Sequence, residues 1–132
     1  MMATLALLLT ALLFGGMTLF SFGFAAVLFS AFGPDDARKG IRATFPHYYL
    51  WVIGTAALAA PTAFVAHPPA AWMMVGIALS TIYARQTLMA QINAATDTGD
   101  TRRFKRLHGA SVVLQLAQIG AAGWALALLA NA

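Results

Sequence analysis

Long apolar stretches separated by short polar ones dominate the hydrophobic pattern of this chain. The first stretch, Ala3 to Phe32, contains no charged residue, and a helix needs about 20 apolar residues to cross a bilayer. Three further apolar stretches follow, each bounded by Gly, Pro or charged residues. The pattern predicts four membrane-spanning helices over residues 3–32, 45–66, 70–96 and 104–130, with charged connections over 33–44 and 97–103.

Helix-breaking residues support these boundaries. Gly33 and Pro34 end the first helix, and Pro46 fits the first turn of the second, where its missing N–H costs nothing. Pro61 falls inside that helix and predicts a kink. In the last turn, Gly99 suits the position after a helix and Asp100 suits an N-cap. Because this turn is short, we expect the last two helices to lie antiparallel and side by side.

The composition places the chain in the membrane class. Hydrophobic residues make up 61%, charged residues 9%, and the mean hydropathy is +0.76, so polar residues are too few to coat a soluble globule. We therefore expect one all-α domain over residues 1–132, an antiparallel bundle of four transmembrane helices. The first helix lacks the positive flank of a signal peptide, so we expect it to be retained. There is no cysteine, which excludes disulfides and thiolate chemistry.

The basic residues are distributed asymmetrically. All eight Lys and Arg residues lie within residues 38–42 or 85–106. The positive-inside rule then predicts that both charged connections face the cytoplasm and both termini face the periplasm, in a multi-pass inner-membrane protein. The net charge of +4 would suggest nucleic acid in a soluble protein. Beside apolar helices, we expect lipid headgroups as the counter-ions instead, and no nucleic acid.

Polar residues form a stripe on the predicted fourth helix. His108, Ser111, Gln115 and Gln118 have the spacing of one helical face, and unsatisfied polar groups in lipid cost several kcal/mol. The stripe should therefore face another helix or a wet cavity. On the third helix its candidate partners are Arg85, Gln86 and Asn93, of which Arg85 or Gln86 should approach it.

Two interpretations of this polar cluster stay open. The first is a set of interhelical hydrogen bonds that hold two helices together, each contributing about 0.6 to 2 kcal/mol. The second is a polar cavity between the third and fourth helices that serves a small-solute or ion transporter, because polar groups inside a span often mark a pathway. His108 is expected to be buried against the third helix in the first case and to line the cavity in the second.

Histidine raises a cofactor alternative. His47 and His108 both begin cytoplasmic helix ends and could together ligate haem b or copper, although the three histidines are too scattered for a structural zinc site. The simpler expectation is no cofactor, with His47 in an interfacial aromatic belt alongside Tyr48, Tyr49 and Trp51. All four carboxylates lie in the charged connections, and Ser111 with His108 lacks an orienting acid, so no catalytic residue and no enzyme is predicted.

Small residues on the first and fourth helices allow helices to approach closely. The glycines expected at such contacts are Gly15, Gly16, Gly23, Gly120 and Gly123. We therefore expect a helix-packing or complex-forming membrane subunit, associated with itself or with a larger membrane complex.

Four segments resemble the transmembrane protein 205-like family, whose bacterial members are of the DUF4149 type, a domain of unknown function. They are LLFGGMTLFSFGFAAVLF in the first helix, FPHYY from Phe45, RQTLMAQINAATDTGD from Arg85 and FKRLHGAS from Phe104. The resemblance implies a four-helix membrane protein without an agreed activity. Eukaryotic relatives are linked to resistance to platinum drugs, which is compatible with metal export or vesicle traffic.

The resemblance also bears on individual residues. His108 and Ser111 match the family pattern and would form its polar centre. The family often has Asn at the position of Gln115, which keeps a hydrogen-bonding side chain there. It often has Arg at the position of His47, which speaks against a shared role for that histidine.

Overall fold

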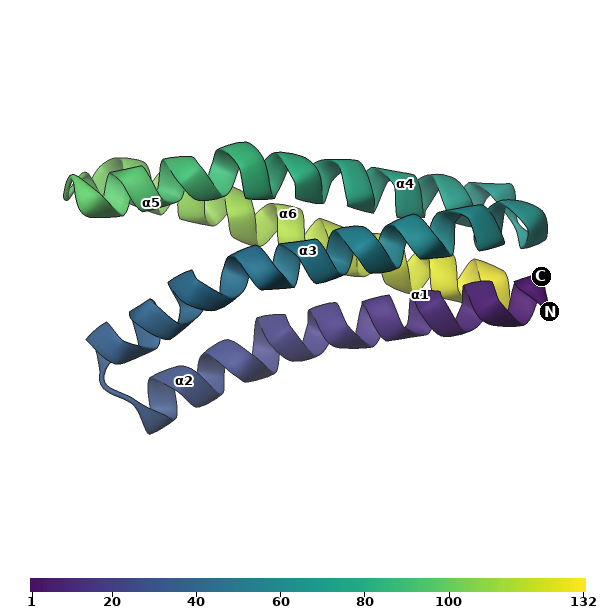
Figure 1. The fold of residues 1–132 in the computed structure, drawn as a ribbon, viewed down its shortest axis with the longest axis horizontal. Helices are drawn as coiled ribbons and strands as arrows, with labels where there is room; N and C mark the ends of the chain where they lie inside the picture. Colours follow the sequence, from purple (N-terminus) through teal and green to yellow (C-terminus); the bar gives the residue numbers. More distant parts are fainter.

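Four helical columns lie side by side in the computed structural model, which describes all 132 residues and contains no strand (Figure 1). Two of the columns contain one turn of π-helix, marked η. The first column is α1 (Met2–Leu19), η1 (Phe20–Phe24) and α2 (Ala25–Ala31); the second is α3 (Pro34–Ala66); the third is α4 (Pro68–Tyr83), η2 (Ala84–Leu88) and α5 (Met89–Asp97); the fourth is α6 (Thr101–Ala130). The predicted all-α class is confirmed.

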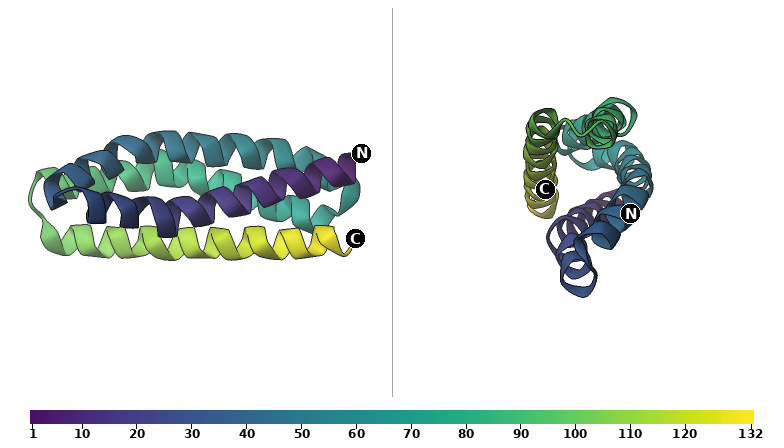
Figure 2. Two further views of the ribbon diagram at one scale, coloured as in Figure 1. Left: turned by 90° about the horizontal axis from the view of Figure 1, so that it is seen from below. Right: turned by 90° about the vertical axis from the view of Figure 1, so that its left-hand side faces the viewer.

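The columns form a closed ring in which each packs against its neighbours in sequence. α1 contacts α3, α3 contacts α4, α4 and α5 contact α6, and α6 returns to contact α1. Both termini lie at one end, here called the terminal end (Figure 1). The connections from α2 to α3 and from α5 to α6 lie at the opposite end, here called the charged end (Figure 2, left).

Three columns are long and apolar enough to cross a membrane: Met2–Ala31, Pro34–Ala66 and Thr101–Ala130. The third column does not meet these criteria of length and hydropathy, so four membrane crossings remain a prediction. A helix of 30 residues is about 45 Å long and exceeds the hydrocarbon core of about 30 Å. The ends of these helices therefore reach into the headgroup region or beyond it.

The second column starts earlier than predicted. The sequence suggested a charged connection over 33–44 and a helix from residue 45, but α3 begins at Pro34 and runs through the charged segment. Gly33 is extended, Pro34 occupies the first turn, and Asp35 and Asp36 favour the positive end of the helix dipole. Pro46 therefore lies in the helix interior rather than at its start, as does Pro61, whose predicted kink stays a prediction.

The two tight turns follow their sequence signals. Gly99 has a φ of +72°, the left-handed conformation that glycine adopts without strain, and the Asp100 side chain accepts a hydrogen bond of 3.1 Å from the Arg103 N–H. At the other turn, His67 Nδ1 accepts from the Ala70 N–H at 3.4 Å and caps α4. His67 thus has a structural role at the terminal end.

Alanine dominates the core, which lies toward the terminal end. The buried cluster of 18 residues draws on α1, α3, α4 and α6 and includes Ala6, Ala56, Ala59, Ala63, Ala70, Ala71, Ala122 and Ala125, filled out by Leu13, Met17, Val52 and Met74. Small side chains let helix backbones approach closely, which is how helices associate where lipid surrounds them. The columns are therefore tightly joined at this end.

Two adjacent glycines allow a matched test of this close packing. A Cβ on Gly16 would collide with the Trp51 ring, whereas a Cβ on Gly15 would meet nothing within 4 Å. We predict that Gly16→Ala lowers the free energy of unfolding by about 1 to 3 kcal/mol relative to Gly15→Ala, because Trp51 must move. Both variants gain the same helix propensity. Equal melting temperatures in detergent would contradict the contact.

Candidate functional site

A cavity of about 770 Å³ lies at the charged end, between α3, α5 and α6. Its volume falls within the range of small-molecule sites in proteins, about 300 to 1,000 Å³. Apolar side chains form much of its wall, among them Phe45, Tyr49, Met89, Ile92, Phe104 and Val112, with Phe29 contributed by α2. Polar side chains on the same wall are Asn93, His108, Ser111 and Gln115.

The cavity exists because the alanine core does not extend to this end. Only a few residues are buried here, such as Ala37, Leu88 and Ala95, and these three lie outside the core cluster, whose edge at the cavity is Tyr49. α3 and α6 are not sequence neighbours and stand opposite each other across the ring (Figure 2, right). The space between them is left to the cavity.

Gln115 joins three columns at the inner part of the cavity wall. Its Nε2 donates to Ser21 Oγ at 2.7 Å and lies 3.3 Å from the hydroxyl oxygen of Tyr48. Ser21 is in η1, and π-helical turns are frequently found at functional sites because they redirect side chains. The Gln115 amide therefore links α6 to both α3 and the first column.

Tyr48 and Tyr49 are core residues, which corrects their assignment to an interfacial belt. They are 7% and 6% exposed, and the Tyr48 ring stacks on Phe20 with centroids 3.9 Å apart and planes 8° from parallel. The sequence signal was ambiguous, because tyrosine suits both an interface and a buried site where its hydroxyl finds a partner. Here the hydroxyl of Tyr48 lies next to Gln115.

Gln118 occupies a sealed contact rather than the cavity. Its Nε2 lies 2.8 Å from Ser80 Oγ and 3.0 Å from Thr81 Oγ1, and the residue is buried. These bonds attach α6 to α4. The predicted stripe thus has two environments. Ser111 and Gln115 line the cavity, whereas Gln118 holds α6 against α4 by hydrogen bonds.

His108 is not buried against the third helix, and of the two expectations only a place in the cavity wall agrees with the structure. It is exposed, lines the outer part of the cavity, and stacks on Phe104 with ring centroids 5.5 Å apart, without a hydrogen bond. His47 is also exposed and does not line the cavity. The structure therefore does not bring His47 and His108 into one site, because helix phase turns His47 away while its neighbours Tyr48 and Tyr49 face inward.

Arg85 and Gln86 do not approach the polar stripe, which is a second correction. Arg85 lies in η2; its Nε donates to the Pro46 carbonyl at 3.4 Å and its Nη1 donates to Gln86 Oε1 at 2.9 Å. Neither residue lines the cavity. Asn93, further along the third column, does line the cavity. The π-helical turn, which the sequence pattern does not reveal, changes the phase of the third column between these residues.

Charged side chains surround the mouth of the cavity. Asp35, Arg38, Lys39 and Arg42 of α3 all line it. Arg42 forms a bidentate ion pair with Asp97 of α5, with N–O distances of 2.7 and 2.9 Å. The hydrogen bonds from Arg42 hold the pKa of the Asp97 carboxyl below its ordinary value of 3.8. This pair joins the second and third columns where they otherwise diverge.

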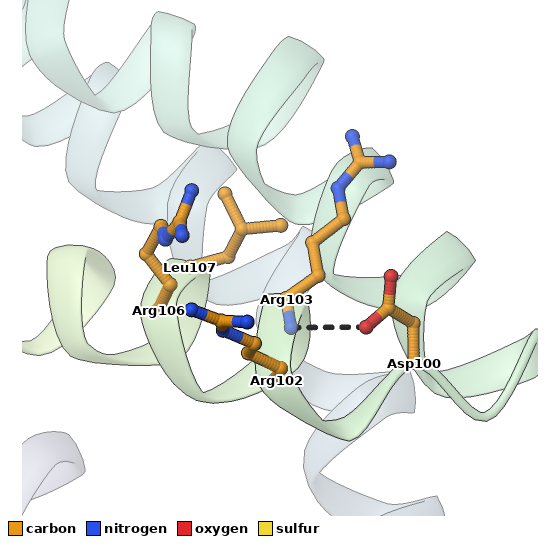
Figure 3. Close-up of a pocket in the computed structure, with 5 residues that line it drawn as sticks. All are labelled: Asp100, Arg102, Arg103, Arg106 and Leu107. Carbon is orange, nitrogen blue, oxygen red and sulfur yellow. Dashed lines mark hydrogen bonds between the residues drawn. The ribbon is translucent and has the colours of Figure 1, made fainter.

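A second, shallower hollow of about 490 Å³ lies at the start of α6 (Figure 3). It is lined by Asp100, Arg102, Arg103, Arg106 and Leu107. Figure 3 shows the Asp100 carboxylate accepting a hydrogen bond from the Arg103 N–H, while the guanidinium groups of Arg102, Arg103 and Arg106 lie apart from that carboxylate. None of the basic residues of α6 forms an ion pair, since the two ion pairs of the structure involve Arg38 and Arg42. The charged end therefore carries uncompensated positive charge.

The glycines expected at helix contacts differ in environment. Gly16 lies against Trp51, and a Cβ on Gly123 would lie 3.1 Å from Phe14 Cε2. Gly15 and Gly120 have no such neighbour, and the space beside Gly23 holds only Leu19 of its own column. Within one chain, Gly16 and Gly123 are the close contacts of this set.

The contrast between Gln118 and His108 gives a prediction. Gln118→Leu removes the interhelical hydrogen bonds to Ser80 and Thr81 and should lower the free energy of unfolding by about 1 to 2 kcal/mol. His108→Leu, on the same helix, should change it by less than about 0.5 kcal/mol because no partner is lost. Thermal unfolding in detergent measures both. A larger loss of unfolding free energy in His108→Leu than in Gln118→Leu would contradict the placement of these side chains.

The Arg42–Asp97 pair predicts a pH dependence. Because the pKa of Asp97 is lower in the folded protein, the stability from this pair is complete above the ordinary value and is lost as pH falls through the folded-state pKa. The melting temperature of Asp97→Asn should lie below that of the wild type at neutral pH, and the gap should close as the pH falls below the ordinary pKa of an aspartate. The control is Asp97→Asn in an Arg42→Gln background, where the ion pair is already absent and no such gap should appear.

No curated protein and no solved structure matches this chain. A family match does exist and covers the first three columns and the turn into α6. It extends over residues 8–101, more than half of the chain, and the family is described as a domain of unknown function, DUF4149. This agrees with the apolar helices and with the bacterial part of the sequence resemblance; the transmembrane protein 205-like part stays a prediction. The chain belongs to the DUF4149 family of membrane proteins.

Proposed function

We propose that this protein crosses the inner membrane four times, with both charged connections in the cytoplasm, and that it binds a ligand in the cavity at its charged end. The cavity carries the proposal: it has the volume of a ligand site and combines apolar walls with a few polar groups. A subunit that only packs helices does not need such a space. No catalytic step is proposed.

The crossing by the third column is supported by its neighbours. α4 contacts both α3 and α6, each long and apolar enough to span. Its buried residues Ala70, Ala71, Met74 and Ile77 belong to the shared core. Removing this column from the bilayer would expose that core, which favours four crossings over three.

The orientation is supported by the charges. All eight basic residues belong to the charged end or the helical segments leading to it, and positively charged ends remain in the cytoplasm. Both termini would then be periplasmic. The cavity opens at the same end, so the ligand would enter from the cytoplasm or from the cytoplasmic leaflet.

The alternative functions suggested by the sequence receive different degrees of support. The cavity supports the hypothesis of a site for a small ligand, but it lies between α3, α5 and α6 rather than only between the last two helices. Haem or copper binding by His47 and His108 gains no support, because His47 lies outside the cavity wall. Self-association or assembly with other membrane proteins stays compatible with ligand binding, through faces such as those around Gly15 and Gly120.

Cysteine accessibility tests the proposal, since the chain has no cysteine of its own. Asn93→Cys, at a half-buried position in the cavity wall, should react with a hydrophilic, membrane-impermeant thiol reagent in inside-out vesicles but not in right-side-out vesicles. Thr98→Cys, at the charged end, should follow the same pattern. Ala132→Cys, at the terminal end, should show the opposite one. Mass spectrometry of the purified variants measures the labelled fraction.

The matched control for the cavity is Ser80→Cys. Ser80 is partly buried, bonds to Gln118 and does not line the cavity, so it should stay unlabelled from both sides. Equal labelling at positions 80 and 93, which are both half-buried, would contradict a water-accessible cavity. Labelling of positions 98 and 132 from the same side would contradict four crossings.

A further inference from the structure

The cavity has two chemically different parts. Its wall carries aromatic and aliphatic side chains such as Phe45, Met89, Ile92 and Val112, whereas its mouth carries Arg38, Lys39 and Arg42. Between them lie Asn93, Ser111 and Gln115, whose side chains can hydrogen-bond a neutral polar group. A ligand that complements the apolar wall, the polar groups and the basic mouth has an apolar body, a polar middle and a negatively charged head.

The charge at the mouth is not neutralised by the protein. Asp35 is the one carboxylate in the wall, and its contact with Arg38 is long, 3.8 Å, and fully exposed. Lys39 has no ion pair, whereas Arg42 is already engaged by Asp97. Arg102, Arg103 and Arg106 add further unpaired charge at the neighbouring hollow (Figure 3). An anionic group would be attracted to this end.

The position of the mouth identifies the source of such a ligand. The helical columns exceed the thickness of the hydrocarbon core, so a charged end that follows apolar segments lies at headgroup depth. A small hydrophilic anion would satisfy the mouth but leave the apolar wall unfilled. A membrane lipid presents both the chain and the charge at the required depths.

We propose that the cavity binds one anionic phospholipid from the cytoplasmic leaflet. Its phosphate lies by Lys39 and Arg38, its ester groups lie by Asn93, Ser111 and Gln115, and an acyl chain lies between α3 and α6. This inference rests on the proposed function, because it needs the charged end to face the cytoplasm and the cavity to be open. Lys39 is the residue that most directly distinguishes a site from a general basic surface.

Native mass spectrometry on protein reconstituted with equal amounts of phosphatidylglycerol and phosphatidylcholine tests the inference. The wild type should retain one phosphatidylglycerol in clear preference to phosphatidylcholine. Lys39→Gln should weaken that retention about fivefold, because the positive charge beside the bound headgroup is lost. Lys105→Gln removes the same charge from α6 at a position that lines neither hollow and should leave retention unchanged. Lys39→Arg should restore it.

A second variant tests the cavity rather than the charge. Ser111→Trp should fill the inner part and abolish the retained lipid, while Val113→Trp, at an exposed position on the same helix, should not. If Ser111→Trp does not fold, the Lys39 and Lys105 pair still decides the matter.

Three results would overturn the inference: equal retention of the two lipids, equal losses in Lys39→Gln and Lys105→Gln, or retention of added free fatty acid in place of phosphatidylglycerol. Labelling of Asn93→Cys from the cytoplasmic side together with any of these would support the cavity and reject only the phospholipid. Absence of that labelling would reject the proposed function itself.

Discussion

Close packing of alanine faces at one end of the bundle is the constraint on which the rest of the structure depends. Within lipid, apolar side chains gain little by leaving their surroundings, so helices associate where small residues allow many short contacts. The core cluster of this protein meets that condition at the terminal end, where Ala56, Ala59 and Ala63 of α3 belong to one buried cluster with alanines of α1, α4 and α6. The four columns are held together there and are free to diverge elsewhere.

The cavity follows from the end of that packing. Beyond the alanines, the inward-facing residues of α3 become Tyr49 and Phe45, which line the cavity, and then the charged groups at its mouth. The Arg42–Asp97 pair spans the second and third columns in this region. Exposed ion pairs contribute little to stability. We therefore infer that the Arg42–Asp97 pair mainly keeps α3 and α5 close together where no buried core joins them.

Buried polar groups fix how the columns are aligned. Gln115 and Gln118 lie one turn apart on α6 but bond to different columns, the first to Ser21 and the second to Ser80 and Thr81. A buried amide without a hydrogen-bond partner is costly. Both amides therefore find their partners only at one rotation of α6 about its axis and one position along it. The π-helical turn at η1 places Ser21 where Gln115 can reach it.

The sequence by itself determined the all-helical class, the membrane character and the turns at Gly33, His67 and Gly99, because these depend on local composition and on residues with special backbone preferences. Its periodicity also placed Ser111, Gln115 and Gln118 on one face of α6. Only the tertiary structure decided that His108 is exposed, that Tyr48 is core, that Arg85 turns to Pro46, and that α3 starts at Pro34. Those outcomes depend on which faces of different helices meet and on a π-helical turn in the third column, and the period of a single helix carries no information about either.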